Sequence, residues 1–97
     1  MHCRITKLKH SQQNQAKISE YLTSVMEEIE AIDGLLRITL ISPSATETLG
    51  LSYYESKEKM ERANEVQQKV LSGVAELLAG APEFEDGDVY WKWSKSI

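Results

Sequence analysis

Hydrophobic and polar residues follow two different periods along this chain, and the change between them is clearest near Ser56. From Thr48 to Tyr54, apolar and polar side chains alternate at every second position, which is the pattern of a strand. After Ser56 the apolar positions recur three or four residues apart as far as Leu78. This spacing predicts a helix with Ser56 as its N-cap and an end near Gly80.

The same two periods occur in the first half of the chain. Residues 2–8 alternate weakly and predict a first strand, after which Ser11 can cap a helix over 12–32. This helix carries an apolar stripe and ends at Asp33-Gly34, where the glycine suits a C-terminal cap. Residues 35–42 predict a second strand, and Pro43 lies in the turn that follows.

A fourth strand is predicted at the C-terminal end, over Val89–Ser94. Val89, Trp91 and Trp93 alternate there with polar residues, after a turn signal at 85–88. The element order is therefore β-α-β-β-α-β, which is the ferredoxin-like α+β pattern. We expect a single domain over 1–97, with a four-stranded antiparallel sheet and two helices on one face.

The phase of each strand predicts which side chains share a face of the sheet. The face beneath the helices is expected to carry Cys3, Ile5, Leu36, Ile38, Leu40, Leu49, Leu51, Tyr53, Val89, Trp91 and Trp93. The opposite face is expected to carry Arg4, Thr6, Leu8, Leu35, Arg37, Thr39, Ile41, Ser52, Tyr54, Tyr90 and Lys92. A slip of one residue in any strand would exchange its faces.

This opposite face is mixed, yet it is too apolar to remain entirely in water. A second copy of the sheet is the simplest cover, so we expect a homodimer in which two sheets pack about a two-fold axis. The result would be a dimeric α/β barrel. Its interior, lined by a few cations and hydroxyls among apolar groups, would suit a small-molecule ligand.

Composition and charge exclude several classes of function. The net charge is −4, which argues against nucleic-acid binding. No apolar run approaches the roughly 20 residues that span a bilayer, and the N-terminus lacks a signal-peptide pattern, so no membrane association and a cytoplasmic location are expected. The single cysteine, Cys3, cannot form an intramolecular disulfide and is expected to be a small buried apolar residue.

The sequence holds no common signature of a metal or cofactor site. There is no HxH or CxxC pair, no Gly-rich phosphate loop and no GxSxG motif. We therefore expect no metal and no cofactor. His2 and His10 are the usual candidates for acid–base work, but their positions near the start of the chain and in the first loop favour surface residues.

The segment Leu51–Glu58, LSYYESKE, resembles a signature of the antibiotic-biosynthesis-monooxygenase-like family, in which an aromatic residue precedes Glu-Ser at the end of the third strand. Tyr54 takes the aromatic position here. The resemblance implies a dimeric α+β barrel, and it implies that some relatives are cofactor-free monooxygenases of polycyclic aromatic or quinol substrates. Members that degrade haem carry a tryptophan and a histidine on the second helix; Ala63 and Gly73 fall there in this chain, which argues against that role.

Candidate site residues follow from the expected barrel face and from the resemblance. The candidate catalytic residues are Arg37, Tyr54 and Tyr90: a cation that stabilises an oxyanion and two hydroxyls that orient a phenol or quinol. The candidate substrate-binding residues are Arg4, Thr39, Ser52, Trp91 and Trp93. For the tryptophans, the alternative is core or interface packing. For the tyrosines and cations, the alternative is hydrogen bonding or ion pairing at the dimer interface.

Two functions of different class remain open. The first is a cofactor-independent monooxygenase, an oxidoreductase that acts on a small aromatic or quinol-like compound which reacts with O₂ as its own carbanion. The second is a non-catalytic dimeric module that binds a small ligand or has a structural role. An open cavity with unpaired arginine or tyrosine groups favours the enzyme, whereas a packed interior favours the module.

Overall fold

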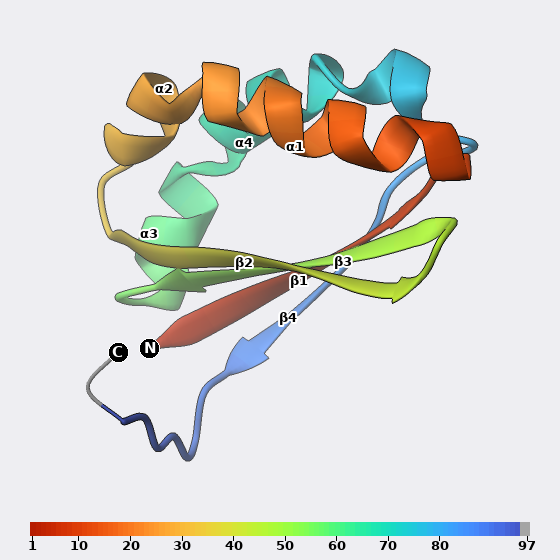
Figure 1. Ribbon diagram of the computed structural model, residues 1–97. Coiled ribbons are helices and arrows are strands. Elements are labelled where there is room, and N and C mark those ends of the chain that lie inside the picture. The colour runs from red at the N-terminus through yellow and green to blue at the C-terminus, as the bar shows by residue number, and fades with distance from the viewer. Residues whose placement is uncertain (96–97) are drawn as a thin grey trace.

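The computed structural model describes residues 1–95. It contains one antiparallel sheet with the strand order β2-β3-β1-β4. Helices α1, α2 and α4 lie across one face of this sheet, and α3 rises from the end of β3 to join them (Figure 1). The strands are β1 (His2–Lys9), β2 (Leu35–Ser44), β3 (Glu47–Tyr54) and β4 (Glu83–Asp88), and the helices are α1 (Gln15–Ser24), α2 (Met26–Glu30), α3 (Lys57–Arg62) and α4 (Asn64–Ser72).

This arrangement confirms the predicted ferredoxin-like α+β fold. Short 3₁₀ turns, η1 (Gln12–Asn14) and η2 (Ala75–Leu77), begin the first helical segment and end the second. The dimeric barrel, and a single domain that extends through 96–97, stay predictions; those last two residues lie outside the described part. No helix within residues 1–95 has both the length and the apolar character needed to cross a membrane.

Both predicted helices are interrupted. The first breaks at Val25 (φ −109°, ψ 24°), where Ser24 Oγ donates a hydrogen bond to the carbonyl of Tyr21 at 2.5 Å. Such side-chain bonds compete with the helical ladder, and the β-branched Val25 adds a poor helix former at the same point. The second helix breaks at Ala63, which ends α3 and begins α4. Each predicted helix is therefore a pair of short helices.

The fourth strand lies six residues earlier than predicted. The structure places it at Glu83–Asp88, over the expected turn, while Val89–Ser94 forms no strand. The prediction failed because β4 is a polar, acidic segment without the apolar alternation of a strand, and it is stabilised as a strand by its pairing with β1. Its register pairs Asp88 with His2 and Glu83 with Lys7 of β1, so that opposite charges meet across the ladder.

The predicted faces of β1 and β3 are also reversed. Arg4, Thr6 and Leu8 are buried on the helix-covered face, where the buried Tyr54 and the half-buried Ser52 of β3 also lie. Cys3, Ile5, Leu49, Leu51 and Tyr53 lie on the opposite, outer face. The polar side of β1 can point inward because its charged groups find partners there, which alternation alone does not reveal.

For β2 the predicted phase is confirmed at its centre. Ile38 pairs with Ser52 and Leu40 pairs with Gly50, on the helix-covered face, whereas Arg37 and Ile41 lie on the outer face. A register shift between Leu35 and Arg37 brings Leu35 to the inner side, where it packs near Tyr54. Such bulges bend a strand locally.

The well-packed core sits toward the ends of the sandwich rather than at its centre. Ile18 and Val74 are each 1% exposed, and Tyr54, Met60 and Ala63 form a second cluster with Leu35 and Ile32. Many large side chains of β2 stay half exposed, including Leu36 at 51% and Leu40 at 39%. The space between β2 and the helices is therefore incompletely filled.

Candidate functional site

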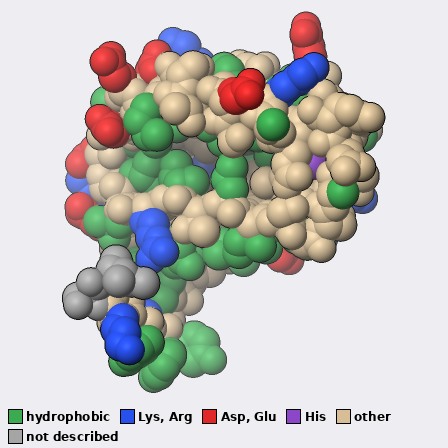
Figure 2. All heavy atoms as spheres, viewed as in Figure 1, with side chains coloured by type: hydrophobic (Ala, Val, Ile, Leu, Met, Phe, Trp, Pro, Cys, Tyr) green, Lys and Arg blue, Asp and Glu red, His purple; other side chains and the backbone are tan. Residues whose placement is uncertain are grey.

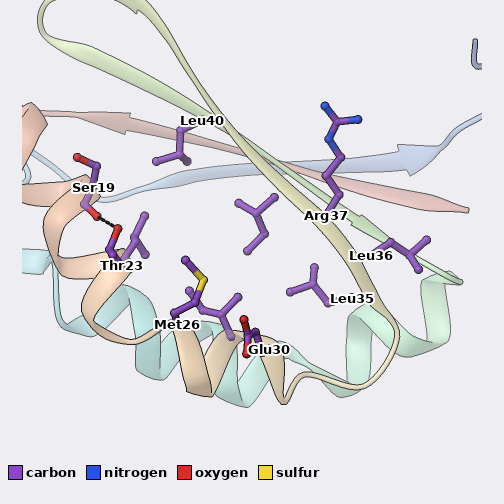
Figure 3. A pocket seen from close by; sticks show the side chains of 11 residues that line it. Ser19, Thr23, Met26, Glu30, Leu35, Leu36, Arg37 and Leu40 are labelled. Atoms are coloured by element: carbon purple, nitrogen blue, oxygen red, sulfur yellow. Dashed lines mark hydrogen bonds between the residues drawn. The ribbon is translucent and has the colours of Figure 1, made fainter. Parts of the chain in front are cut away.

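A cleft opens between β2 and helices α1 and α2, as the hollow in the centre of Figure 2 shows. Its mouth has a volume of about 450 Å³ and is mostly apolar. Figure 3 shows that Leu35 and Leu40 of β2 lie on the side of the strand that faces Met26 and Glu30 of α2 and Ser19 and Thr23 of α1. Leu36 also lines the mouth, but in this view its side chain extends from the other side of β2. Glu30 is the single carboxylate among the mouth residues that the structure describes.

Next to the mouth, a smaller inner cavity of about 90 Å³ lies beneath α4. Leu22, Ile29, Ile38 and Leu40 line both the mouth and the inner cavity, so the two hollows are adjacent. Because the strand order is β2-β3-β1, the inner cavity crosses β3 and reaches β1. Its polar lining residues are Thr6, Ser52, Tyr54 and Gln67. An apolar hollow with a few polar groups is the usual build of a small-molecule site.

Arg4 lies behind Tyr54 at this polar end. Its guanidinium carbon is 5.8 Å from the centroid of the Tyr54 ring, in cation–π range. Nη2 donates hydrogen bonds to the side-chain oxygen of Asn64 and to the carbonyl of Met60. Nη1 is buried and has no hydrogen-bond partner within the described residues. A buried cation with a spare donor favours negative charge close by.

Tyr54 is 2% exposed, and burial raises the pKa of its hydroxyl, with a smaller opposing effect from Arg4. Burial acts this way because it penalises the phenolate. At neutral pH, Tyr54 is therefore a protonated donor beside a fixed cation. This pair can stabilise an oxyanion that forms on a bound molecule.

The structure brings together three of the candidate site residues and separates the other five. Ser52 and Tyr54 line the inner cavity, and Arg4 lies against the Tyr54 ring without lining the cavity itself. Arg37 lines the mouth of the cleft, but its side chain points away from the other mouth residues (Figure 3), and Thr39 lies on the outer face of β2. The other three, Tyr90, Trp91 and Trp93, are 98%, 76% and 70% exposed in the tail after β4.

Both histidines are buried, which corrects the expectation of surface residues. His2 Nε2 lies 2.7 Å from Asp86 Oδ2, and Nδ1 lies 2.7 Å from Asp88 Oδ1. These carboxylates, Asp86 first, raise the pKa of His2. His10 Nδ1 donates to the carbonyl of Ser11 at 2.9 Å, which leaves Nε2 to accept from Thr48 at 2.8 Å. Neither imidazole lines the cleft.

Cys3 is half-buried on the outer face, and burial raises the pKa of its thiol. It is therefore a weak nucleophile at neutral pH. Within residues 1–95, no group of three histidine, cysteine or carboxylate side chains is placed to hold a metal ion.

Thr6, Gln67 and Asn64 were not selected from the sequence. Thr6 and Gln67 line the cavity, and Asn64 binds Arg4. Thr6 was placed on the wrong face through the phase of β1. Gln67 occupies a polar position one helical turn before Leu71, which also lines the cavity, and this spacing on the helix was the signal available.

Comparison of the fold with solved structures defines the class of protein that this chain resembles. Antibiotic biosynthesis monooxygenase-like proteins share the fold over nearly the whole chain, at sequence identities of 9 to 20%. The expected resemblance is thus confirmed for the fold. No protein-family model matches the sequence, and no curated protein matches it.

Three solved structures illustrate the likeness. A monooxygenase from the gene ActVA-Orf6 of Streptomyces coelicolor, solved with the ligand nanaomycin D, is 20% identical, with a TM-score of 0.73 and coverage of 98% of this chain and 92% of that one. SnoaB, a cofactor-independent oxygenase from Streptomyces nogalater, is 9% identical, with a TM-score of 0.75 and 97% coverage of both chains. A dimeric ferredoxin-like protein from an uncultured marine organism is 14% identical, with a TM-score of 0.78 and coverage of 98% and 92%.

Proposed function

We propose that this protein is a cofactor-independent monooxygenase that oxidises a small aromatic or quinol-like compound in the cleft between β2 and the helices. The observation that carries the proposal is the mostly apolar inner cavity next to the cleft mouth: Tyr54 lines this cavity, and the Arg4 cation lies against the Tyr54 ring. Solved structures of similar fold include a cofactor-independent oxygenase and a monooxygenase with a bound ligand. The proposed substrate site is therefore between the sheet and the helices, not between two sheets.

The proposed reaction uses the substrate itself as the electron donor. A benzylic CH₂ that is activated by a neighbouring carbonyl, as in an anthrone, loses a proton to water in the mouth and becomes a carbanion stabilised as an enolate. Tyr54 donates a hydrogen bond to the enolate oxygen, and the Arg4 cation stabilises its charge. The carbanion then reduces O₂, one oxygen forms a bond to carbon, and the hydroperoxide eliminates water to leave a ketone. The balance is CH₂ + O₂ → C=O + H₂O.

The lining of the inner cavity limits the class of substrate. Its described residues include no histidine, carboxylate or lysine, so no side chain there can act as a strong base. We therefore expect substrates acidic enough to ionise into water near neutral pH, such as anthrones and quinols. A compound that needs a strong base would not react.

Oxygen consumption tests the proposal. The purified protein is mixed with a panel of anthrones and quinols, and O₂ uptake is followed with an electrode while the product is analysed after reaction with isotopically labelled dioxygen. We expect uptake above the buffer rate, and label in the new ketone. An unchanged rate across the panel would contradict the enzyme.

The second candidate is a non-catalytic module that binds the same class of ligand. The missing base in the described inner cavity favours it. Titration calorimetry with the same compounds, in the absence of oxygen, distinguishes the two. Saturable binding without any later O₂ uptake would support the binding module.

We also propose that the protein works as a homodimer formed through the outer face of the sheet, in the cytoplasm. Ile5, Leu49, Leu51 and Tyr53 give this face an apolar centre, and Ile41 beside them is 42% exposed. A neighbour of similar fold is described as dimeric. Sedimentation at several concentrations tests the assembly, and a single species with the mass of one chain would contradict it.

A further inference from the structure

The segment after β4 has the sequence of a strand but no strand beside it. From Val89 to Lys95 the side chains Trp91, Trp93 and Lys95 alternate with Tyr90, Lys92 and Ser94, yet the segment adopts no strand within the described residues. Its first amide, from Val89, donates to the carbonyl of Met1 at 2.9 Å, and beyond this point the chain leaves the sheet (Figure 1). An exposed segment with two large aromatic side chains indicates a missing partner.

An open strand edge lies at the other side of the sheet. β2 is the last strand in the order, so one of its edges has no neighbouring strand. The same strand forms the floor of the cleft mouth, where Leu36, Ile38 and Leu40 are 51%, 40% and 39% exposed. Unpaired strand edges bind extended segments through backbone hydrogen bonds, and pockets for alternate side chains then give specificity.

We propose that the segment 89–95 of a second copy adds to the free edge of β2 and lays Trp91 and Trp93 over the mouth of the cleft. The substrate site is then completed by the partner. This inference rests on the proposed dimer and on the proposed function of the cleft. It adds that Trp91 and Trp93 of the second copy close the cleft.

The alternation of the segment fits this position. When Trp91 and Trp93 face the apolar mouth, Lys95 lies on the same side of the added strand. The described mouth residues include one carboxylate, Glu30, and one cation, Arg37, and α2 also holds the exposed Glu27 and Glu28. The basic end of the segment thus meets an acidic helix, which favours this placement of the two tryptophans.

The chain's own segment cannot place both tryptophans beside β2. β4 and β2 are opposite edges of the sheet, separated by three strand spacings, about 14 Å in total. An extended chain advances about 3.3 Å per residue, so about four residues would be used to cross the ends of β1 and β3. Trp91 would still lie over those strand ends and not beside β2. A second copy, approaching from the outer face, has no such limit.

The areas involved are also consistent with a dimer. A buried tryptophan removes about 150–250 Å² from water, so the four tryptophans of two exchanged segments contribute roughly 600–1,000 Å². Stable interfaces bury about 1,200–2,000 Å² in total. The outer faces of the two sheets would supply the remainder.

Cross-linking tests the contact without any substrate or oxygen. In a Cys3→Ser background, Trp93→Cys protein is mixed with Leu36→Cys protein, and a short bismaleimide is added. We expect a covalent species with the mass of two chains. Replacement of the second protein by Glu65→Cys, on α4 behind α1 in Figure 1, is expected to give little product. Equal yields would overturn the proposal, and so would an intrachain cross-link in the Leu36→Cys/Trp93→Cys double variant.

Fluorescence gives a second readout, because Trp91 and Trp93 are the chain's two tryptophans. We expect blue-shifted emission protected from acrylamide in the dimer, and water-like emission after dilution to single chains. A dimer with water-like emission would overturn the exchange of segments while leaving the outer-face dimer standing.

Binding of the apolar dye anilinonaphthalene sulfonate to the cleft gives a third readout. Its affinity should weaken about three- to tenfold in Trp91→Ser/Trp93→Ser and stay unchanged in Tyr90→Ser. Equal binding by the two variants would contradict closure of the cleft by the tryptophans.

Discussion

The imidazole of His2 at the start of β1 is joined to the carboxylate of Asp86 on β4, with 2.7 Å between Nε2 and Oδ2. Asp88 makes a second contact of the same length to Nδ1. With both ring nitrogens bonded to carboxylates, the charged imidazolium is favoured and the pKa of His2 rises above its ordinary value of 6.5. The pKa values of both carboxyls fall for the same reason. The contact thus fastens the edge strand β4 to β1.

This ion cluster makes stability depend on pH in both directions. His2 contributes stability below pH 6.5 that is lost as the pH rises through its raised folded pKa. Asp86 and Asp88 contribute stability above pH 3.8 that is lost as the pH falls through their lowered folded pKa values. Stability from the cluster should therefore be greatest between these limits. Lys57, the N-terminal amine and Arg4 are the other charged groups that act on the carboxylates.

The variant Asp86→Asn should return the pKa of His2 toward 6.5, because Asp86 is the larger cause of the shift. Asp88→Asn should lower the pKa by less. The measurement is an NMR titration of the His2 ring protons in each variant, accompanied by thermal melts across the same pH range. A His2 pKa that is unchanged in both variants would show that the cluster does not form in solution.

The adjacent residues Tyr53 and Tyr54 provide a matched pair across the sheet. Tyr54 lines the cleft, whereas Tyr53 lies on the outer face. If the Tyr54 hydroxyl stabilises an oxyanion, Tyr54→Phe should lower kcat by about a hundredfold, and Tyr53→Phe should leave kcat unchanged. Steady-state O₂ uptake gives the rates, and chemical denaturation shows whether each variant is folded. An equal fall in both variants would assign the loss to the fold.

A second matched pair concerns helix capping. Ser56 Oγ accepts a hydrogen bond from the Lys59 amide at 3.1 Å, which confirms Ser56 as the N-cap of α3. Ser11, also predicted as a cap, makes no such side-chain bond to η1. Ser56→Ala should reduce the free energy of unfolding by about 1 kcal/mol, whereas Ser11→Ala should change it by less than about 0.5 kcal/mol. Urea denaturation checks both values, and a larger loss in Ser11→Ala would contradict the assignment.

Close packing between the helical layers predicts a third contrast. A Cβ atom added at Gly73 would lie 2.1 Å from the hydroxyl oxygen of Tyr21, so the ring would have to move. Gly80 has nothing within 4 Å of the same position. Gly73→Ala should cost about 1–3 kcal/mol in the free energy of unfolding, and Gly80→Ala should cost little. Thermal denaturation provides the comparison, and a stable Gly73→Ala protein would show that Tyr21 relocates freely.

The element order could be predicted from the sequence because the strand and helix periods of the apolar residues are each set by residues close together along the chain. The strand–helix junction at Ser56 and the phase of the centre of β2 depend on neighbouring residues alone, and both agree with the structure, whereas Leu35 at the start of β2 does not. The phase of β1 could not be predicted, because it depends on partners far along the chain: Asn64 for Arg4, and Asp86 for His2. The position of β4 failed for the same reason, since its charges are explained by β1.

For the candidate site too, local features could be predicted from the sequence, and features that depend on distant residues could not. Arg4, Ser52 and Tyr54 were selected correctly as neighbours, because they share one phase in two paired strands. They were assigned to the wrong side of the sheet, because the inward burial of Arg4 depends on Asn64, Met60 and Tyr54. The tail tryptophans were selected for their chemistry, and no local signal shows that their strand partner lies outside the chain's own sheet.

The interruption at Val25 leaves α2 as five residues, Met26–Glu30, above the mouth of the cleft. Such a short helix is stabilised by few backbone hydrogen bonds of its own, whereas α1 beside it is also stabilised by the burial of Ile18. Local opening free energies follow such differences, so amide hydrogens of α2 should exchange sooner than those of the strands below. Under the proposed function, local opening of α2 over the more stable strands would let the cleft accept ligands of different width without any change in the sheet.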